Sequence, residues 1–284
     1  MISVASRVTN KTENEMNHHA TSRVSAIVEV ITPTLAAAYL SKSGGNRPLK
    51  RGRIDGLVSD IAAGRWVVNG EAIIFSDTGE LIDGHHRLTA ISKGNLAVQS
   101  LVVRNAPQAS KATIDTGASR GAGDVLSING VAQGRLVASI VAVLVNLANG
   151  APRSVSPSHA EIVEFVGRHP DISAAAQAAD GVRFSITPVI GAVFFVANRI
   201  GLSAEADDFC DVLRSGVPAY NGCPAHRLRE VLIKDQLALR SMSRELKQRL
   251  VVHAWSKFEA REKVSTLRVP EVFRLKGWPD ADVW

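Results

Sequence analysis

The 284-residue sequence is poor in cysteine and has no long apolar run. Cys210 and Cys223 are the only cysteines and form no CxxC pair, which argues against a disulfide framework or a thiolate metal site. The closest approach to a membrane span, Leu136 to Leu147, falls short of the roughly 18–20 apolar residues that a bilayer requires. The first residues are charged and contain no apolar core typical of a secretory signal. We therefore expect a soluble, cytoplasmic protein with no membrane partner.

Positive charge is concentrated in one part of the chain. Lys and Arg total 33 against 27 Asp and Glu, and residues 226–276 contain 13 Lys and Arg against six acidic residues. Such a segment is typical of a DNA-binding surface, and it is equally typical of a solvated helix face. If the segment binds DNA, the candidate contacts are Arg240, Arg244, Lys247, Lys257 and Arg261. Trp255 lies among these basic residues and can stack on bases, but its helical spacing favours a core position.

The pattern of apolar residues predicts an α+β protein with two domains. Residues 1–22 are polar and aperiodic and indicate a flexible tail. Residues 23–131 alternate between helix and strand signals and predict a small α/β domain. Residues 132–284 predict an all-α domain with Pro and Gly between its helices.

The first domain is expected to contain two helices before its first strand. Thr32 or Thr34 can cap a short helix, and Ile54, Leu57, Val58 and Ile61 form the apolar face of a second one that ends at Gly64. The remaining elements are expected as strands at 71–75, 81–82, 97–103 and 112–114 and a helix at 86–92.

The second domain is expected to contain six helices, at 133–149, 158–168, 186–200, 204–214, 226–239 and 243–261. In the last of these, Leu246, Leu250, Ala254 and Phe258 recur every four residues and predict a core stripe.

One turn carries the residues most suited to chemistry, Asp83-Gly84-His85-His86-Arg87, between a predicted strand and a predicted helix. Helix N-termini attract anions because their first N–H groups lack internal partners and the helix dipole is positive there. Gly84 allows close backbone approach to a ligand, and Arg87 can donate two hydrogen bonds to a phosphate. His85 or His86 can act as an acid or base, and Asp83 can hold Mg²⁺. The alternative is a helix capped by Asp83 with two surface histidines.

Two further motifs have both a functional and a structural interpretation. Glu71, just before a strand, can be a catalytic or metal-bound carboxylate or a satisfied turn residue. Asp115-Thr116-Gly117 matches half of an aspartic-protease site, but such a site needs two copies. A single copy predicts a turn.

The turn and its surroundings resemble the ParB/sulfiredoxin superfamily. The elements match in order: Asn46-Arg47-Pro48-Leu49, the helix from Ile54, the Asn69–Phe75 strand segment and the turn at Gly84 to Arg87. The chain also resembles ParB-like proteins of phages and mobile elements with helical C-terminal regions. That second resemblance is carried by the segments 114–117, 160–165 with His169-Pro170, and 254–258.

The resemblance implies a nucleotide, ATP or CTP with Mg²⁺, bound by Gly84, His85, His86, Arg87, Asn46 and Arg47. Two departures from the family pattern matter. Sulfiredoxin has its reactive Cys where His85 stands, so sulfinic-acid repair is not expected. ParB has Glu at that place and a second Arg where His86 stands, which puts CTP specificity in doubt.

The sequence thus predicts an NTP-dependent hydrolase or phosphotransferase with His85, His86, Asp83 and Glu71 as its candidate catalytic residues. The alternative is a DNA-binding, regulatory or nuclease-like protein of phage or mobile-element origin that uses residues 226–276. A partner-binding protein with a vestigial site is a third hypothesis, and homo-oligomerisation is left open.

Overall fold

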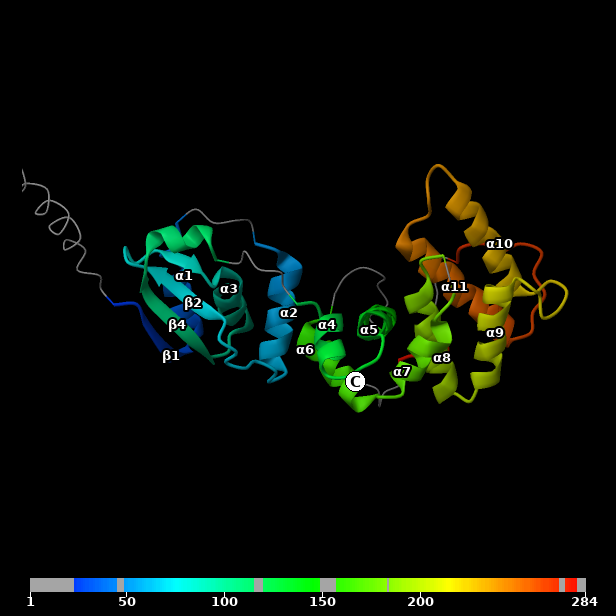
Figure 1. Cartoon of the computed structure of the whole chain (residues 1–284), viewed down its shortest axis with the longest axis horizontal. Coiled ribbons are helices and arrows are strands. Elements are labelled where there is room, and N and C mark those ends of the chain that lie inside the picture. The colour runs from blue at the N-terminus through cyan, green and yellow to red at the C-terminus, as the bar shows by residue number, and fades with distance from the viewer. Residues whose placement is uncertain are drawn as a thin grey trace, which may run out of the picture. The chain divides into compact units, whose positions relative to one another are not determined.

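The computed structural model describes residues 23–44, 49–114, 120–148, 157–182, 184–270 and 274–279. They belong to two compact units, Met1–Gly117 (unit 1) and Ala118–Trp284 (unit 2), whereas the sequence analysis placed the division at residue 131. The described residues contain one four-stranded sheet, in unit 1, and eleven α-helices (Figure 1). The α+β class expected from the sequence is therefore confirmed.

Unit 1 is built on a mixed sheet with the strand order β1-β4-β2-β3. β4 pairs antiparallel with β1 and parallel with β2, and β3 returns antiparallel along β2. The strands are β1 Ser25–Ile31, β2 Ala72–Ser76, β3 Leu81–Asp83 and β4 Val98–Ala106. The expected β2–β3 hairpin and the strand that follows Ala97 are confirmed.

Two expectations for unit 1 are corrected. The expected strand at 112–114 is absent, since the chain forms a 3₁₀ helix, η1 (Gln108–Ala112), and then a turn. There the amides of Ser110 and Thr113 bond back to the carbonyls of Pro107 and Ser110, so they cannot join a sheet. Conversely, β1 was not predicted, because this edge strand exposes Ile27 and Val28 in succession and shows no clean alternation.

The helices of unit 1 pack on one face of the sheet. They are α1 Pro33–Leu40, α2 Arg51–Ala62 and α3 His85–Gly94. Ile73 and Val102, paired in register on β2 and β4, are fully buried together with Leu88 and Ile91 of α3. Because side chains alternate along a strand, the other face carries Val28, which is half exposed. Unit 1 is thus a two-layer α/β structure.

The described residues of unit 2 form helices joined by turns and loops, with no strand. Its helices are α4 Ala122–Ile128, α5 Gly134–Ala148, α6 His159–Arg168, α7 Ile172–Ala179, α8 Thr187–Arg199, α9 Ser203–Ser215, α10 Pro224–Leu237 and α11 Arg244–Glu259. The six expected helices are confirmed with ends shifted by one or two residues. The short helices α4 and α7 were not predicted.

The core of unit 2 surrounds α8, where every residue from Val189 to Ala197 is buried. α8 contacts α5, α7, α9 and α11 (Figure 1). Trp255 of α11 is 1% exposed, which confirms its core position. Three residues of the predicted α11 stripe are also buried, but Leu246 is 38% exposed, so that part of the stripe prediction is wrong.

None of the helices in the described ranges combines the length and apolar character needed to cross a membrane. The Asp115-Thr116-Gly117 motif lies outside the described residues.

Candidate functional site at the start of α3

The turn from β3 into α3 is fixed by Gly84. Its φ angle of +101° lies in the left-handed region, which L side chains rarely adopt. A Cβ at this position would lie 3.1 Å from the Cα of Ile73 on β2. Gly84 therefore permits a close approach to the neighbouring strand, and the close approach to a ligand remains a prediction. His85 becomes the first residue of α3 as a direct result.

Arg87 is held in place by hydrogen bonds to other residues of unit 1. Its Nη1 donates to Glu71 Oε2 at 2.8 Å, and its Nη2 donates to Asp83 Oδ2 at 3.0 Å and to the Ala72 carbonyl at 2.6 Å. The side chain is only 12% exposed, and its Nε is buried with no acceptor among the described residues. Arg87 thus joins the start of β2 to the end of β3, and its guanidinium is largely engaged within unit 1.

The two carboxylates with expected catalytic or metal roles differ in exposure. Glu71 has a side chain that is 60% exposed, whereas that of Asp83 is 23% exposed, and both accept from Arg87. Within the described ranges no three His, Cys, Asp or Glu residues gather into a group that could hold a metal ion. Mg²⁺ binding by Asp83 therefore remains a prediction.

His86 brings the start of α2 beside the start of α3. Its Nε2 accepts the backbone N–H of Lys50 at 3.1 Å, and Lys50 is the residue that precedes α2. Neither helix has a side-chain hydrogen bond capping its N-terminus, and neither carries an acidic residue in its first turn. The positive ends of two helix dipoles therefore meet at His86, a favourable place for an anion.

His85 points to a partner that the sequence analysis missed. Its Nε2 lies 2.6 Å from Oγ of Ser43, in the segment that follows α1. Burial lowers the pKa of His85. The charges of Asp83 and Glu80 oppose this shift, whereas that of Lys111 adds to it. The net pKa lies below the usual 6.5, so the imidazole is neutral at pH 7.

An acidic residue with two donors lies next to this pair. Glu80 accepts from Lys111 Nζ at 2.9 Å and from Gln108 Nε2 at 2.7 Å, and these bonds lower its pKa. A Cβ on Gly44 would lie 2.5 Å from Glu80 Oε1, so the backbone beside Ser43 passes close to this carboxylate.

The structure thus gathers most of the predicted site residues in unit 1. Asp83, Gly84, His85, His86, Arg87 and Glu71 lie together, while Asn46 and Arg47 lie outside the described residues. Ser43, Lys50, Glu80 and Lys111 were missed because only tertiary folding brings them to the turn. Ser43 stands just before Gly44 and Gly45, and this position predicted only that the preceding helix ends there.

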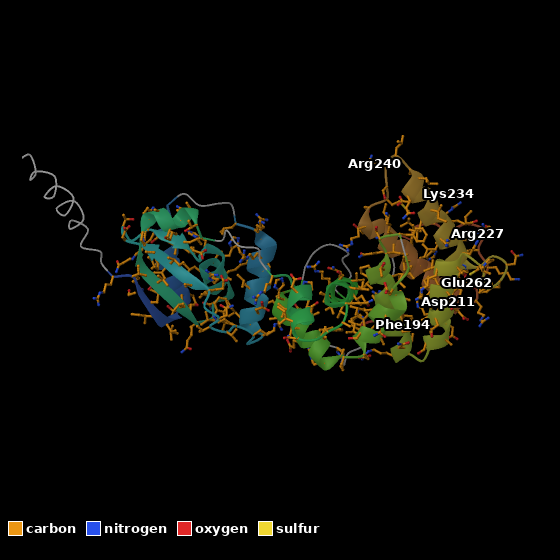
Figure 2. All side chains as sticks on the ribbon, viewed as in Figure 1. Phe194, Asp211, Arg227, Lys234, Arg240 and Glu262 are labelled. Atoms are coloured by element: carbon orange, nitrogen blue, oxygen red, sulfur yellow. The ribbon has the colours of Figure 1, made fainter. Side chains whose placement is uncertain are left out.

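The basic segment 226–276 belongs to unit 2 and is partly neutralised. Lys247 pairs with the buried Asp235 at 2.8 Å, and Lys257 pairs with Glu262 at 2.7 Å. Arg240, Arg244 and Arg261 are exposed and make no ion pair with a described residue. Figure 2 shows Arg227, Lys234 and Arg240 along the outer side of α10 and the loop that follows it.

Comparison of the chain with protein-family models, with curated proteins and with solved structures finds no match. The function therefore has to be argued from the site itself.

Proposed function

We propose that unit 1 is a ParB/sulfiredoxin-like domain that binds a nucleotide through its phosphates where α2 and α3 begin. ATP and CTP are the expected nucleotides, and hydrolysis or phosphoryl transfer is the expected reaction. The observation that carries the proposal is the contact between His86 Nε2 and the Lys50 amide, which joins two helix N-termini. Both N-termini lack acidic residues in the first turn, and the nearby carboxylates of Asp83 and Glu71 are paired with Arg87.

The residues of the turn have distinct roles in this proposal. Because His86 accepts the Lys50 N–H at Nε2, Nδ1 is the ring atom that would donate to a phosphate oxygen. Arg87 holds the turn in shape by bonding Asp83 and Ala72. Mg²⁺ would arrive bound to the phosphates, and Asp83 is the candidate carboxylate for it.

A thermal-shift panel of ATP, CTP, GTP, UTP and ADP, with and without Mg²⁺, tests the proposal. A nucleotide at 100 times its dissociation constant should stabilise the protein by about 2.7 kcal/mol. The shift should vanish in His86→Ala and persist in His159→Ala, a matched change at the start of α6. His86 is a better choice than Arg87, whose removal would disturb the turn itself. The absence of a shift with every nucleotide would contradict the proposal.

A second candidate function is DNA binding by unit 2. It is favoured by the exposed side chains of Lys234 and Arg240, which make no ion pair with a described residue (Figure 2). Contacts to DNA phosphates make affinity fall steeply with salt. Affinity that does not change with salt would argue against this function and leave a protein partner as the better hypothesis.

A further inference from the structure

Ser43 and His85 form a hydrogen-bonded pair that is fixed from both sides. The amide of Ser43 bonds to the Leu40 carbonyl at the end of α1, and Ser43 forms a β-bridge with Leu81 on β3. His85 is fixed by the left-handed Gly84 turn and by its place at the start of α3. The 2.6 Å separation of Oγ and Nε2 is a short hydrogen bond within the range for a nucleophile and its base.

The surroundings of the pair suit proton transfer from Ser43 to His85. In the tautomer with its hydrogen on Nδ1, His85 has a lone pair on Nε2 that can accept the hydroxyl proton across the 2.6 Å contact. The carboxylates of Asp83 and Glu80 favour the imidazolium that forms, and Lys111 disfavours it. Ser43 is exposed, so an electrophile can reach its oxygen.

The pair lies at the N-terminus of α3, since His85 is the first residue of that helix. Charge that develops on an electrophile's oxygens during attack would meet the positive end of the helix dipole. The arrangement therefore contains a nucleophile, a base and a source of positive potential.

We propose that Ser43 is a nucleophile, with His85 as its general base, and that it attacks a phosphorus electrophile. The Oγ–H proton passes to Nε2, an Oγ–P bond forms, and the bond from phosphorus to the leaving group breaks as that group takes the electron pair. With an NTP the leaving group is the NDP, and Ser43 becomes a phosphoserine. Where an NTP is the phosphoryl donor, the inference rests on the proposed function. Where a fluorophosphonate is the reagent, the inference is independent of it.

The first test is labelling of the full chain with a fluorophosphonate probe, mapped by mass spectrometry. We expect label on Ser43, none in Ser43→Ala, and a rate about 100-fold lower in His85→Ala, as is typical of a lost general base. Ser41 provides the matched control, because its hydroxyl donates to the Ala38 carbonyl and bonds no histidine of the described residues. Ser41→Ala should label at the wild-type rate.

Thermal unfolding separates a base from a residue that only supports the fold. His85→Ala should label slowly while retaining the wild-type melting temperature to within a few degrees. Equal labelling of Ser41 and Ser43, or an unchanged rate in His85→Ala, would overturn the inference.

A second assay with γ-labelled ATP and CTP distinguishes this inference from the nucleotide proposal. Fluorophosphonate label on Ser43 without transfer from any nucleotide would support the pair and count against nucleotide phosphotransfer. A nucleotide-specific thermal shift with no label on Ser43 from either reagent would overturn the pair and leave nucleotide binding standing.

Discussion

Gly84, between β3 and α3, shows how a single residue determines the geometry of the site. Its positive φ directs the chain from the end of β3 into the first turn of α3. The adjacent residues His85 and His86 thereby reach different partners. Because consecutive residues on a helix point about 100° apart, His85 faces Ser43 while His86 faces Lys50. One turn thus serves two contacts.

Gly84→Ala should destabilise unit 1 by about 1–3 kcal/mol, because it combines an unfavourable φ with a Cβ that contacts Ile73. Urea denaturation followed by circular dichroism measures the change. Gly56→Ala in α2 is the control, since nothing lies within 4 Å of its Cβ. That substitution should stabilise the helix by roughly 0.5–1 kcal/mol, and equal losses in the two variants would refute the account of Gly84.

Arg87→Gln should lower the free energy of unfolding by about 1–3 kcal/mol, because it leaves the Ala72 carbonyl and Asp83 without a donor. The comparison is Arg135→Gln, which removes an ion pair whose arginine is 86% exposed. An exposed pair contributes about 0–1 kcal/mol. Denaturant titration of both variants checks the difference, and a smaller loss for Arg87→Gln would show that its bonds matter little to stability.

At the scale of elements, apolar periodicity was sufficient to predict the long helices and insufficient to predict the edge strand β1 and two short helices. The six longer helices of unit 2 were predicted because each repeats apolar residues over several turns. β1, α4 and α7 were missed because seven or eight residues give too little periodicity, and β1 is also exposed on one face. The equally short α1 was predicted from its Thr cap. The turn at 83–87 was found because its residues are contiguous, whereas Ser43 and Lys50 reach it only through folding.

The crossing of α4 and α5 requires two glycines. A Cβ at Gly134 would lie 2.6 Å from the Gly123 carbonyl oxygen, and a Cβ at Gly123 would lie 2.6 Å from the Cα of Arg135. Gly134→Ala should therefore force the backbones apart and destabilise unit 2 by about 1–3 kcal/mol. Thermal unfolding of this variant and of Gly167→Ala, which meets nothing within 4 Å in α6, tests the expectation. Similar melting temperatures for both would contradict it.

Asp235 joins α10 to α11 and should make this joint sensitive to acid. Its carboxylate accepts from Lys247, Ser241 and the Met242 amide, and these bonds, that of Lys247 above all, hold its pKa below the usual 3.8. A lowered pKa in the folded state gives stability that is present above pH 3.8 and lost as the pH falls through the lower value.

Asp235→Asn should therefore be less stable than the wild type at pH 7, and the difference should shrink below about pH 4. Denaturant titrations between pH 3 and pH 7 measure it. Asp211→Asn is the control, because Asp211 is 73% exposed and its ion pair with Arg214 lies within one helix. A difference for Asp235→Asn that stays constant with pH would contradict the expected linkage.

At the scale of the whole molecule, ion pairing decides which of the many basic side chains can meet an external polyanion. The chain carries 33 Lys and Arg against 27 Asp and Glu, so most cations have an acid available. In unit 2, Asp235 holds Lys247 and braces the loop that carries Arg240, while Arg240 and Arg244 extend without an ion pair to the described residues. The loop is thus hydrogen-bonded to Asp235 at its base and positively charged at its surface.

The double variant Arg240→Ala/Arg244→Ala should reduce the salt dependence of DNA binding if unit 2 grips the phosphate backbone. Each cation that contacts a phosphate contributes about 0.9 to the slope of log K against log salt, so the slope should fall by about 2. Fluorescence anisotropy with a labelled duplex measures the slope between about 50 and 200 mM salt. In this range phosphate contacts dominate the change in affinity. Lys93→Ala, an exposed lysine of unit 1 paired with Asp55, should leave the slope unchanged. An equal decrease in both variants would mean that net charge, rather than this loop, attracts DNA.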